Sequence, residues 1–204
     1  FAMHAASTYG CHVTTITISQ EQHNLATQRV KDAGLDHLID VQLVDYREVD
    51  GEYDKIVSIE MFEAVGSEYF ETFFQKCAGI LKPGGRLVMQ VITVPDRDYD
   101  AQRDGVNWIQ KYIFPGGVLP SVAEMERCGV RTGLVLDSAD DIGEHYATTL
   151  HQWRDRFWQR IDEVRDQGYD EHFVRTWDYY LAICEAGFLT CNTGDAQVAF
   201  DKVG

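Results

Sequence analysis

Two carboxylates, Glu60 and Glu63, directly follow a short apolar stretch of the chain. That stretch, Ile56, Val57 and Ile59 with a serine among them, is typical of a central strand that is buried on both faces of a sheet. Open α/β sheets bind their ligands beyond the carboxyl ends of the strands, so carboxylates there could orient a ligand or act on a proton. A solvated loop can also begin with two acidic residues, and the pair alone does not distinguish these readings.

The sequence around this pair alternates between helical and extended patterns. Ser19, with Gln22 three residues later, predicts a capped helix, and Gly34 predicts its end. The expected elements are helices at 1–9, 19–34 and 67–81, strands at 12–18, 39–44, 56–59 and 86–94, a turn at 82–85 and a last strand at 194–202. This order predicts a doubly wound α/β fold, with a minor helix in the connection after 39–44.

The segment 95–188 interrupts this alternation and is expected to be a mostly helical insertion within a single domain that covers 1–204. Aromatic residues are dense in it, among them Trp108, Trp153, Trp158 and Trp177. We interpret this density as a large apolar pocket over the ends of the strands, with ordinary helix packing as the alternative.

Charge and cysteine content narrow the class of protein. The formal net charge of -15 argues against non-specific nucleic-acid binding, which needs Lys and Arg to neutralise phosphates. It also disfavours electrostatic docking on an anionic membrane. The five cysteines are an odd number without a CxxC pair, which favours a reducing, cytosolic compartment. No Cys/His cluster has the spacing of zinc ligands, so no metal site is expected.

The missing phosphate-binding motifs restrict the cofactor. The sequence has neither a GxGxxG after a strand nor a GxxxxGK[ST], and Thr17-Ile18-Ser19 ends the strand at 12–18 without an acidic ribose ligand. Nicotinamide dinucleotides and ATP are therefore disfavoured. A cofactor without phosphates, such as S-adenosylmethionine, fits better.

Five motifs in order give a more specific indication. They are IVSIEMFEAVG at 56–66, KPGG at 82–85, KYIFPGGVLPS at 111–121, HYATTLHQW at 145–153 and YYLAICEAGF at 179–188. With this spacing the chain resembles the cyclopropane-fatty-acyl-phospholipid synthase family, which includes the mycolic-acid cyclopropane synthases, over essentially its whole length. The resemblance implies a Rossmann-like class I methyltransferase sheet with a helical lipid-binding insertion. It also implies that the family's first strand and glycine-rich loop precede residue 1.

The resemblance further implies roles for single residues. Near S-adenosylmethionine it places Thr17, Ile18 and Gln22 around the ribose, Tyr46 and Arg47 beside the adenine, and the Ile59 backbone under the methionine part. Glu63 and Tyr146 would hold a bicarbonate ion that acts as general base. Cys184, Phe114 and Leu150 would line the acyl tunnel near the reacting carbon. The alternatives are a helix N-terminal carboxylate for Glu63 and a small buried hydrophobe for Cys184.

The implied reaction is methyl transfer to the cis double bond of an unsaturated phospholipid or fatty acyl chain. The resulting carbocation could be stabilised by aromatic faces, and a base would then remove a proton to close a cyclopropane ring. Such a substrate implies transient contact of a cytoplasmic protein with the inner face of the membrane. A homodimer is compatible with the sequence, whereas nucleic acid is not an expected partner.

Gln90 is a departure from the family's pattern. The best-known members have a histidine here that contacts the bicarbonate, whereas a glutamine amide can donate a hydrogen bond but cannot titrate. Loss of a proton from a neighbouring carbon would then give a methylene-branched or methyl-branched chain in place of a ring. The competing functions are methyl transfer to a small amine and a non-catalytic acyl-binding module.

Overall fold

The computed structural model describes residues 1–203, in two compact units that divide after Gly51. The first unit is Phe1–Gly51, and the second begins at Glu52. Each unit is described below by itself. That 1–204 forms one domain remains a prediction.

The first unit is a small β-α-β arrangement in which most of the expected elements are present. They are α1 (Ala2–Tyr9), β1 (Val13–Thr17), α2 (Gln20–Asp32), β2 (Ile39–Leu43) and the 3-10 helix η1 (Tyr46–Glu48). β1 and β2 pair in parallel, from Val13 opposite Ile39 to Thr17 opposite Leu43. Ser19 caps α2 by accepting a hydrogen bond from the Gln22 N–H, as its sequence predicted.

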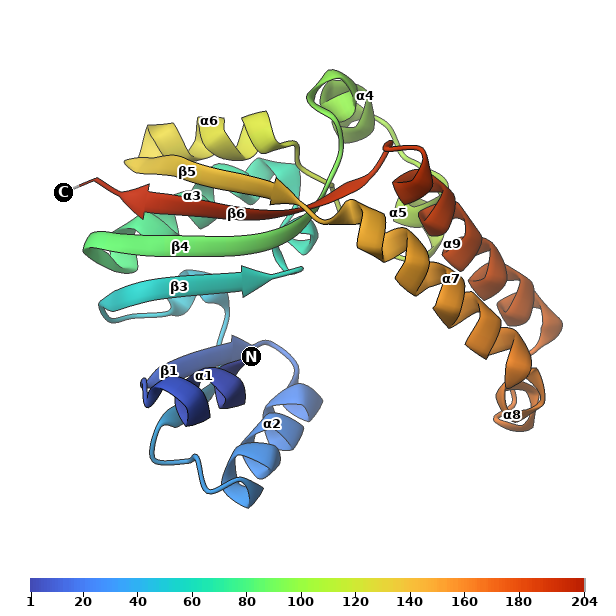
Figure 1. Cartoon of the computed structure of the whole chain (residues 1–204), viewed down its shortest axis with the longest axis horizontal. Coiled ribbons are helices and arrows are strands. Elements are labelled where there is room, and N and C mark those ends of the chain that lie inside the picture. The colour runs from blue at the N-terminus through green and yellow to red at the C-terminus, as the bar shows by residue number, and fades with distance from the viewer. Residues whose placement is uncertain (204) are drawn as a thin grey trace. The chain divides into compact units, whose positions relative to one another are not determined.

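The second unit contains a four-stranded sheet in the order β3-β4-β6-β5. Its strands are β3 (Tyr53–Ile59), β4 (Leu81–Thr93), β5 (Leu134–Asp141) and β6 (Gly194–Lys202). β3 and β4 are parallel, and β6 is antiparallel to both of its neighbours. The expected last strand therefore lies inside the sheet (Figure 1).

Three details differ from the sequence expectations. β5 falls within the predicted helical insertion and was not expected, because most of its residues are polar and exposed and only Leu134 is buried. The predicted turn at 82–85 is an irregularity inside β4, where the pairing shifts and Gly84 adopts a φ of +72°. β3 is an edge strand of this sheet, so Val57 is 40% and Ile59 49% exposed instead of buried on both faces.

One face of this sheet carries the core of the second unit. α3 (Phe70–Ile80), which follows the 3-10 helices η2 (Phe62–Ala64) and η3 (Ser67–Tyr69), contributes Phe74 to this core. The Phe74 ring packs edge-on against Phe200 of β6. α6 (Val122–Thr132) packs closely against the Phe200 ring, since a Cβ on Gly129 would lie 2.9 Å from an atom of that ring. The opposite face of β4, with Gln90 and Ile92, is only partly covered.

The remaining helices are η4 (Asp96–Asp98), α4 (Tyr99–Asp104), α5 (Trp108–Tyr112), α7 (Gly143–Gln159), α8 (Ile161–Asp166) and α9 (Glu171–Leu189). Of these, α7, α8 and α9 form an arm beside the sheet, whereas α4 lies over the end of the sheet from which the arm extends (Figure 1). α7 and α9 pack together around Ala147, Leu150, Leu181 and Phe188, and the ion pair of Arg154 with Asp178, at 2.7 Å, links them.

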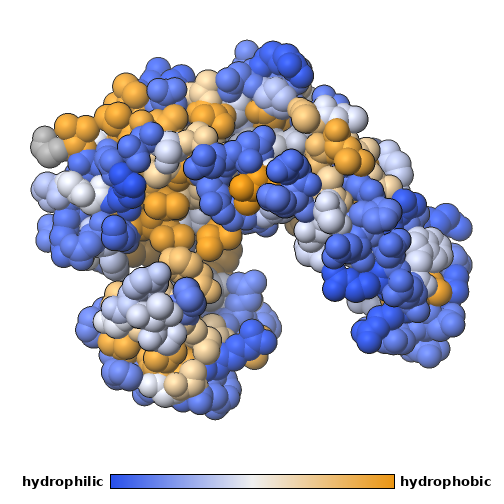
Figure 2. Space-filling view, viewed as in Figure 1, coloured by the Kyte–Doolittle hydropathy of each residue, from blue (hydrophilic) through white to orange (hydrophobic). Residues whose placement is uncertain are grey.

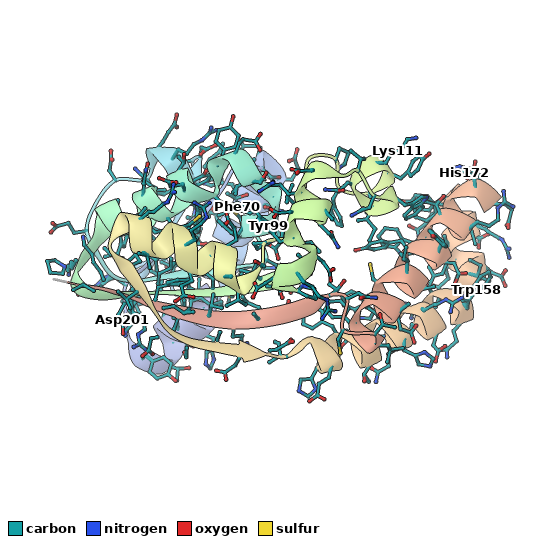
Figure 3. All side chains as sticks on the ribbon, turned by 90° about the horizontal axis from the view of Figure 1, so that it is seen from above. Phe70, Tyr99, Lys111, Trp158, His172 and Asp201 are labelled. Atoms are coloured by element: carbon teal, nitrogen blue, oxygen red, sulfur yellow. The ribbon has the colours of Figure 1, made fainter. Side chains whose placement is uncertain are left out.

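The far end of this arm is the end that points away from the sheet. Trp158 and His172 lie at that end, and Asp201 lies at the opposite end of the unit (Figure 3). On the face shown in Figure 2, the far end is mainly hydrophilic. Within residues 1–203, none of the helices combines the length and the apolar character that a membrane span requires.

Candidate active site

Glu63 is fixed at the carboxyl ends of β3 and β4 by the core beneath it. Its neighbour Phe62 is fully buried and stacks on Phe70 with ring centroids 4.2 Å apart, which anchors η2 against α3. This anchoring turns Glu63 towards β4, where its Oε1 accepts a hydrogen bond of 2.6 Å from the Ile92 N–H. The other oxygen, Oε2, is buried and has no hydrogen-bond partner within residues 1–203. Glu63 therefore keeps one oriented acceptor for a ligand.

Tyr146, Gln90 and Glu60 form a hydrogen-bonded cluster beside Glu63. The Tyr146 hydroxyl donates to Glu60 and accepts from the Gln90 amide at 2.6 Å. The same amide donates to Glu60 at 3.1 Å, and the Gln197 amide donates to the Gln90 oxygen at 3.2 Å. Three of the predicted residues, Glu63, Gln90 and Tyr146, are thus brought together.

Two glycines permit the close approach that places Tyr146 in this cluster. α7 begins at Gly143, where a Cβ would lie 3.2 Å from the Asp195 nitrogen and from the Gly194 Cα. A Cβ on Gly194 would in turn meet the Thr93 hydroxyl at 2.9 Å. Larger residues at either position would separate the start of α7 from β6 and displace Tyr146, one helical turn further on.

Burial governs the electrostatics of the cluster. It raises the pKa of the Glu63 carboxyl, with the nearby Glu60 charge adding to this and the Ile92 N–H opposing it. Burial, followed by the hydrogen bond to Glu60, holds the pKa of the Tyr146 hydroxyl well above its usual range. Tyr146 therefore stays protonated at neutral pH and serves as a hydrogen-bond donor.

Two of the predicted acyl-tunnel residues lie on the helical arm. Leu150 is buried between α7 and α9, and Cys184 packs against the same group of side chains as Tyr146 and Ile92. Burial raises the pKa of the Cys184 thiol to about 11, which makes it a neutral apolar surface and not a nucleophile at neutral pH. Phe114 follows α5, is 57% exposed and contacts the Tyr180 ring edge-on at 6.1 Å between centroids.

The expected large pocket over the strand ends does not coincide with either of two cavities found among the described residues. One cavity of about 400 Å³ lies between α7, α8 and α9 and is lined in part by Trp153, Phe157 and Trp177. Another of about 400 Å³ lies where β4 ends, beside Thr93 and Phe188. Neither is lined by Glu63 or Tyr146.

The predicted cofactor residues are divided between the two units. In the first unit, the Thr17 hydroxyl donates to the Gln22 side chain at 2.7 Å, and Ile18 is 79% exposed. Arg47 of η1 binds Asp45 through two hydrogen bonds and lies over the Tyr46 ring at 5.8 Å. Ile59 ends β3 in the second unit, immediately before Glu60. Their assignment to a cofactor remains a prediction.

Sequence reasoning noted Glu60 only as one of two carboxylates that could act on a ligand, and it did not identify Asp195, which lies beside the cluster. Glu60 has a φ of +48°, which is uncommon for a residue with a side chain and is often found at functional sites. Asp195 is 0% exposed, in the strand that holds Ala196 and Val198. The signal in the sequence that could have identified Asp195 is a carboxylate beside the apolar residues Ala196 and Val198 of the predicted last strand.

Comparison with known proteins identifies the family of the chain. The family model described as mycolic acid cyclopropane synthetase matches residues 1–198. The tuberculostearic acid methyltransferase UfaA1 of Mycobacterium tuberculosis is 47% identical over 184 residues, which are 90% of this chain and 43% of that protein. The cyclopropane-fatty-acyl-phospholipid synthase of Escherichia coli K12 is 35% identical over 201 residues, which are 98% of this chain and 50% of that protein. The chain thus spans about half the length of these two relatives.

Among solved structures, the mycolic acid cyclopropane synthase CmaA1 complexed with SAH and CTAB superposes with a TM-score of 0.88 at 25% identity. The match covers 98% of this chain and 73% of that one. The sheet and its helical insertion therefore define a Rossmann-like methyltransferase fold, as the sequence predicted. The chain belongs to the mycolic acid cyclopropane synthetase family.

Proposed function

We propose that the protein containing this chain transfers a methyl group from S-adenosylmethionine to the double bond of an unsaturated fatty acyl chain. The observation that supports this most directly is the cluster of Glu63, Tyr146 and Gln90 at the strand ends, beside an apolar helical arm, in a member of this family. The relatives named above act, by their names, on fatty acyl compounds, which favours a lipid over a small amine.

S-adenosylmethionine, when bound, supplies an electrophilic methyl group. Because an isolated alkene is a poor nucleophile, the protein must align the double bond with that methyl group and exclude water. Leu150, Cys184 and Phe188 offer the apolar surface for this alignment. Tyr146 and Phe188 lie with ring centroids 5.1 Å apart, and their faces would stabilise positive charge that develops on the acyl chain.

A base must then remove a proton from the alkylated chain. The unpartnered Glu63 Oε2 is suited to accept a hydrogen bond from a small anion such as bicarbonate, and the Tyr146 hydroxyl, which donates to Glu60 here, would turn its proton to the bound anion. Glu63 would orient the anion by accepting its hydrogen bond, while the Ile92 N–H keeps Glu63 in place.

The first test is methyl transfer and cofactor binding by the full-length protein. Radiolabel from S-adenosylmethionine should enter unsaturated phospholipid in vesicles, and calorimetry should show binding of S-adenosylmethionine. Binding without transfer to lipid but with transfer to small amines would favour the amine methyltransferase. Acyl binding without S-adenosylmethionine binding would favour the acyl-binding module.

Gln22→Ala should weaken S-adenosylmethionine binding about tenfold, because it removes an amide that would contact the ribose and that positions Thr17. Calorimetry measures this change directly. Gln28→Ala is the matched control, since Gln28 lies on the same helix and its exposed side chain donates a hydrogen bond of 2.7 Å to Asp32. Equal affinities of the two variants would remove Gln22 from the cofactor site.

We assign as the product a branched chain that is still unsaturated, with either a methylene or a methyl group as the branch, because proton loss restores one double bond. Gln90 cannot carry charge, and the 47% identical relative is named a methyltransferase, not a cyclopropane synthase. Gln90→His should therefore raise the cyclopropane fraction of the products severalfold. Mass spectrometry of lipids from cells that express each full-length form measures the ratio of branched to cyclopropane chains. Cyclopropane chains as the sole product of the unmodified protein would contradict the assignment.

A lipid substrate also requires access to a membrane. The hydrophilic far end of the arm in Figure 2 and the net charge of -15 argue against deep insertion. We place the protein in the cytoplasm with transient contact at the inner face of the membrane, with a homodimer as an open arrangement. Sedimentation with vesicles of unsaturated phospholipid tests the contact, and light scattering tests the dimer.

A further inference from the structure

Asp195 is a buried titratable group that the mechanism above does not use. Its side chain is 0% exposed, and neither carboxylate oxygen has a hydrogen-bond partner of normal geometry in the part of the chain that is described. Burying an ionised carboxylate without partners is costly, and proteins rarely retain such a group by chance. Its position therefore requires an explanation.

The sheet register directs Asp195 towards the cluster. Asp195 lies opposite Ile92 in the β4–β6 pair, and Gln197 lies opposite Gln90, so these four side chains share one face of the sheet. Ile92 is the residue whose N–H holds Glu63. Asp195 is thus connected to Glu63 through its cross-strand partner Ile92.

Titratable neighbours face Asp195 from each adjoining element. They are Glu60 after β3, Glu63 on η2, Tyr146 on α7 and Asp141 on β5. Asp141 accepts a hydrogen bond of 3.2 Å from the Asp195 backbone N–H, and the Asp195 carboxylate lies within electrostatic reach of Glu60 and Tyr146. The cluster has no lysine, arginine or histidine among these neighbours.

We propose that Asp195 is a positioning residue that holds a proton and thereby leaves the Tyr146 hydroxyl proton available to Glu60 and, when an anion is bound, to that anion. This inference rests on the proposed methyl transfer. The Tyr146 hydroxyl has one proton, which it donates to Glu60, and it can accept a second hydrogen bond besides that from Gln90. A protonated Asp195 supplies that second bond without adding charge. An ionised Asp195 competes with Glu60 for the single hydroxyl proton and repels a bound anion.

The charge of Asp195 changes near neutral pH. Burial, followed by the Glu60 charge, raises the pKa of its carboxyl to about 7, while the Tyr146 hydroxyl opposes the rise. Asp195 is therefore neutral below this pH and ionised above it. Anion binding, and with it methyl transfer, should weaken as the pH rises through this range. In a site where Gln90 cannot titrate, Asp195 supplies the pH response.

The test compares Asp195→Asn with the unmodified full-length protein. Asparagine can donate to Tyr146 but cannot ionise, so the variant should retain activity above neutral pH. The ratio of variant to unmodified kcat/KM should rise about fivefold between about pH 6 and about pH 8.5. The ratio cancels the pH dependence of the substrate, the cofactor and dissolved bicarbonate. Asp100→Asn, at an exposed position, is the matched control and should give a constant ratio.

Carboxyl NMR of protein labelled with ¹³C-aspartate provides a second readout that needs no activity. One aspartate resonance should titrate near neutral pH and be absent from Asp195→Asn. Tyr146→Phe keeps Asp195 but removes the hydroxyl that lowers its pKa, so the midpoint should rise by roughly half a pH unit.

The two readouts separate failure of this inference from failure of the proposed function. An aspartate spectrum without a near-neutral titration overturns the inference, as does a ratio that is constant with pH in an active enzyme. Absence of methyl transfer at every pH overturns the proposed function, and the NMR titration with its Tyr146→Phe shift then still decides whether Asp195 holds the proton.

Discussion

Replacing Glu63 with glutamine should lower kcat/KM for methyl transfer about 10²–10³-fold. The amide keeps the shape of the side chain and can still accept from the Ile92 N–H. It loses the carboxylate oxygen that would receive the hydrogen bond of the bound anion, and in a buried site this loss is not compensated by water. Steady-state kinetics with vesicles of unsaturated phospholipid measure the effect.

The control for this prediction is Glu68→Gln. Glu68 follows Glu63 by five residues, is exposed and lies in η3, so its replacement changes the same charge without touching the cluster. Its activity should stay within about twofold of the unmodified protein. Affinity for S-adenosylmethionine should be unchanged in both variants. A Glu63→Gln protein with near-normal turnover would place Glu63 outside the catalytic machinery.

Replacing Phe62 with alanine should lower the free energy of unfolding by about 3–5 kcal/mol, because a fully buried ring is lost and a cavity is left. Phe62 contacts three aromatic rings of α3, with centroids 4.2–5.6 Å away. Urea denaturation followed by circular dichroism measures the change. Since Phe62 anchors η2, the enzymatic activity should fall as well, even at urea concentrations well below the midpoint of denaturation.

Leu189→Ala provides the comparison for this stability effect. Leu189 ends α9 with an exposed side chain, so its truncation should change the free energy of unfolding by less than about 0.5 kcal/mol. If Phe62→Ala were as stable as Leu189→Ala, the aromatic cluster would not be the anchor of the site.

The sequence predicted the elements whose residues alternate or repeat with a clear apolar period. The strand ending at Thr17, the cap at Ser19 and the helix with Phe73 and Phe74 were all correctly located. β5 escaped prediction because an edge strand needs few apolar residues: its neighbour β6 and the backbone ladder hold it in place. Tertiary pairing, not local pattern, determines that strand.

The same distinction between local pattern and tertiary pairing applies to the residues of the candidate site. Glu63, Gln90 and Tyr146 were identified from motifs and come together in the structure. Asp195 could not be identified, because its significance depends on lying opposite Ile92 across a pairing of distant segments. Glu60 was recognised as a carboxylate, but its left-handed backbone and its bond to Tyr146 are properties of the folded chain.

The interior position of β6 has a consequence for biosynthesis. β4 emerges from the ribosome long before β6, since Gln90 and Gln197 are 107 residues apart, and until then β4 keeps an open edge. Such distant pairing is slow to form, so that edge stays exposed to non-native pairing until β6 docks. Because β6 also brings Asp195 and Gln197 to the cluster, the candidate site is complete only after β6 has been made. A chain that has been synthesised only as far as β5 therefore lacks a finished site.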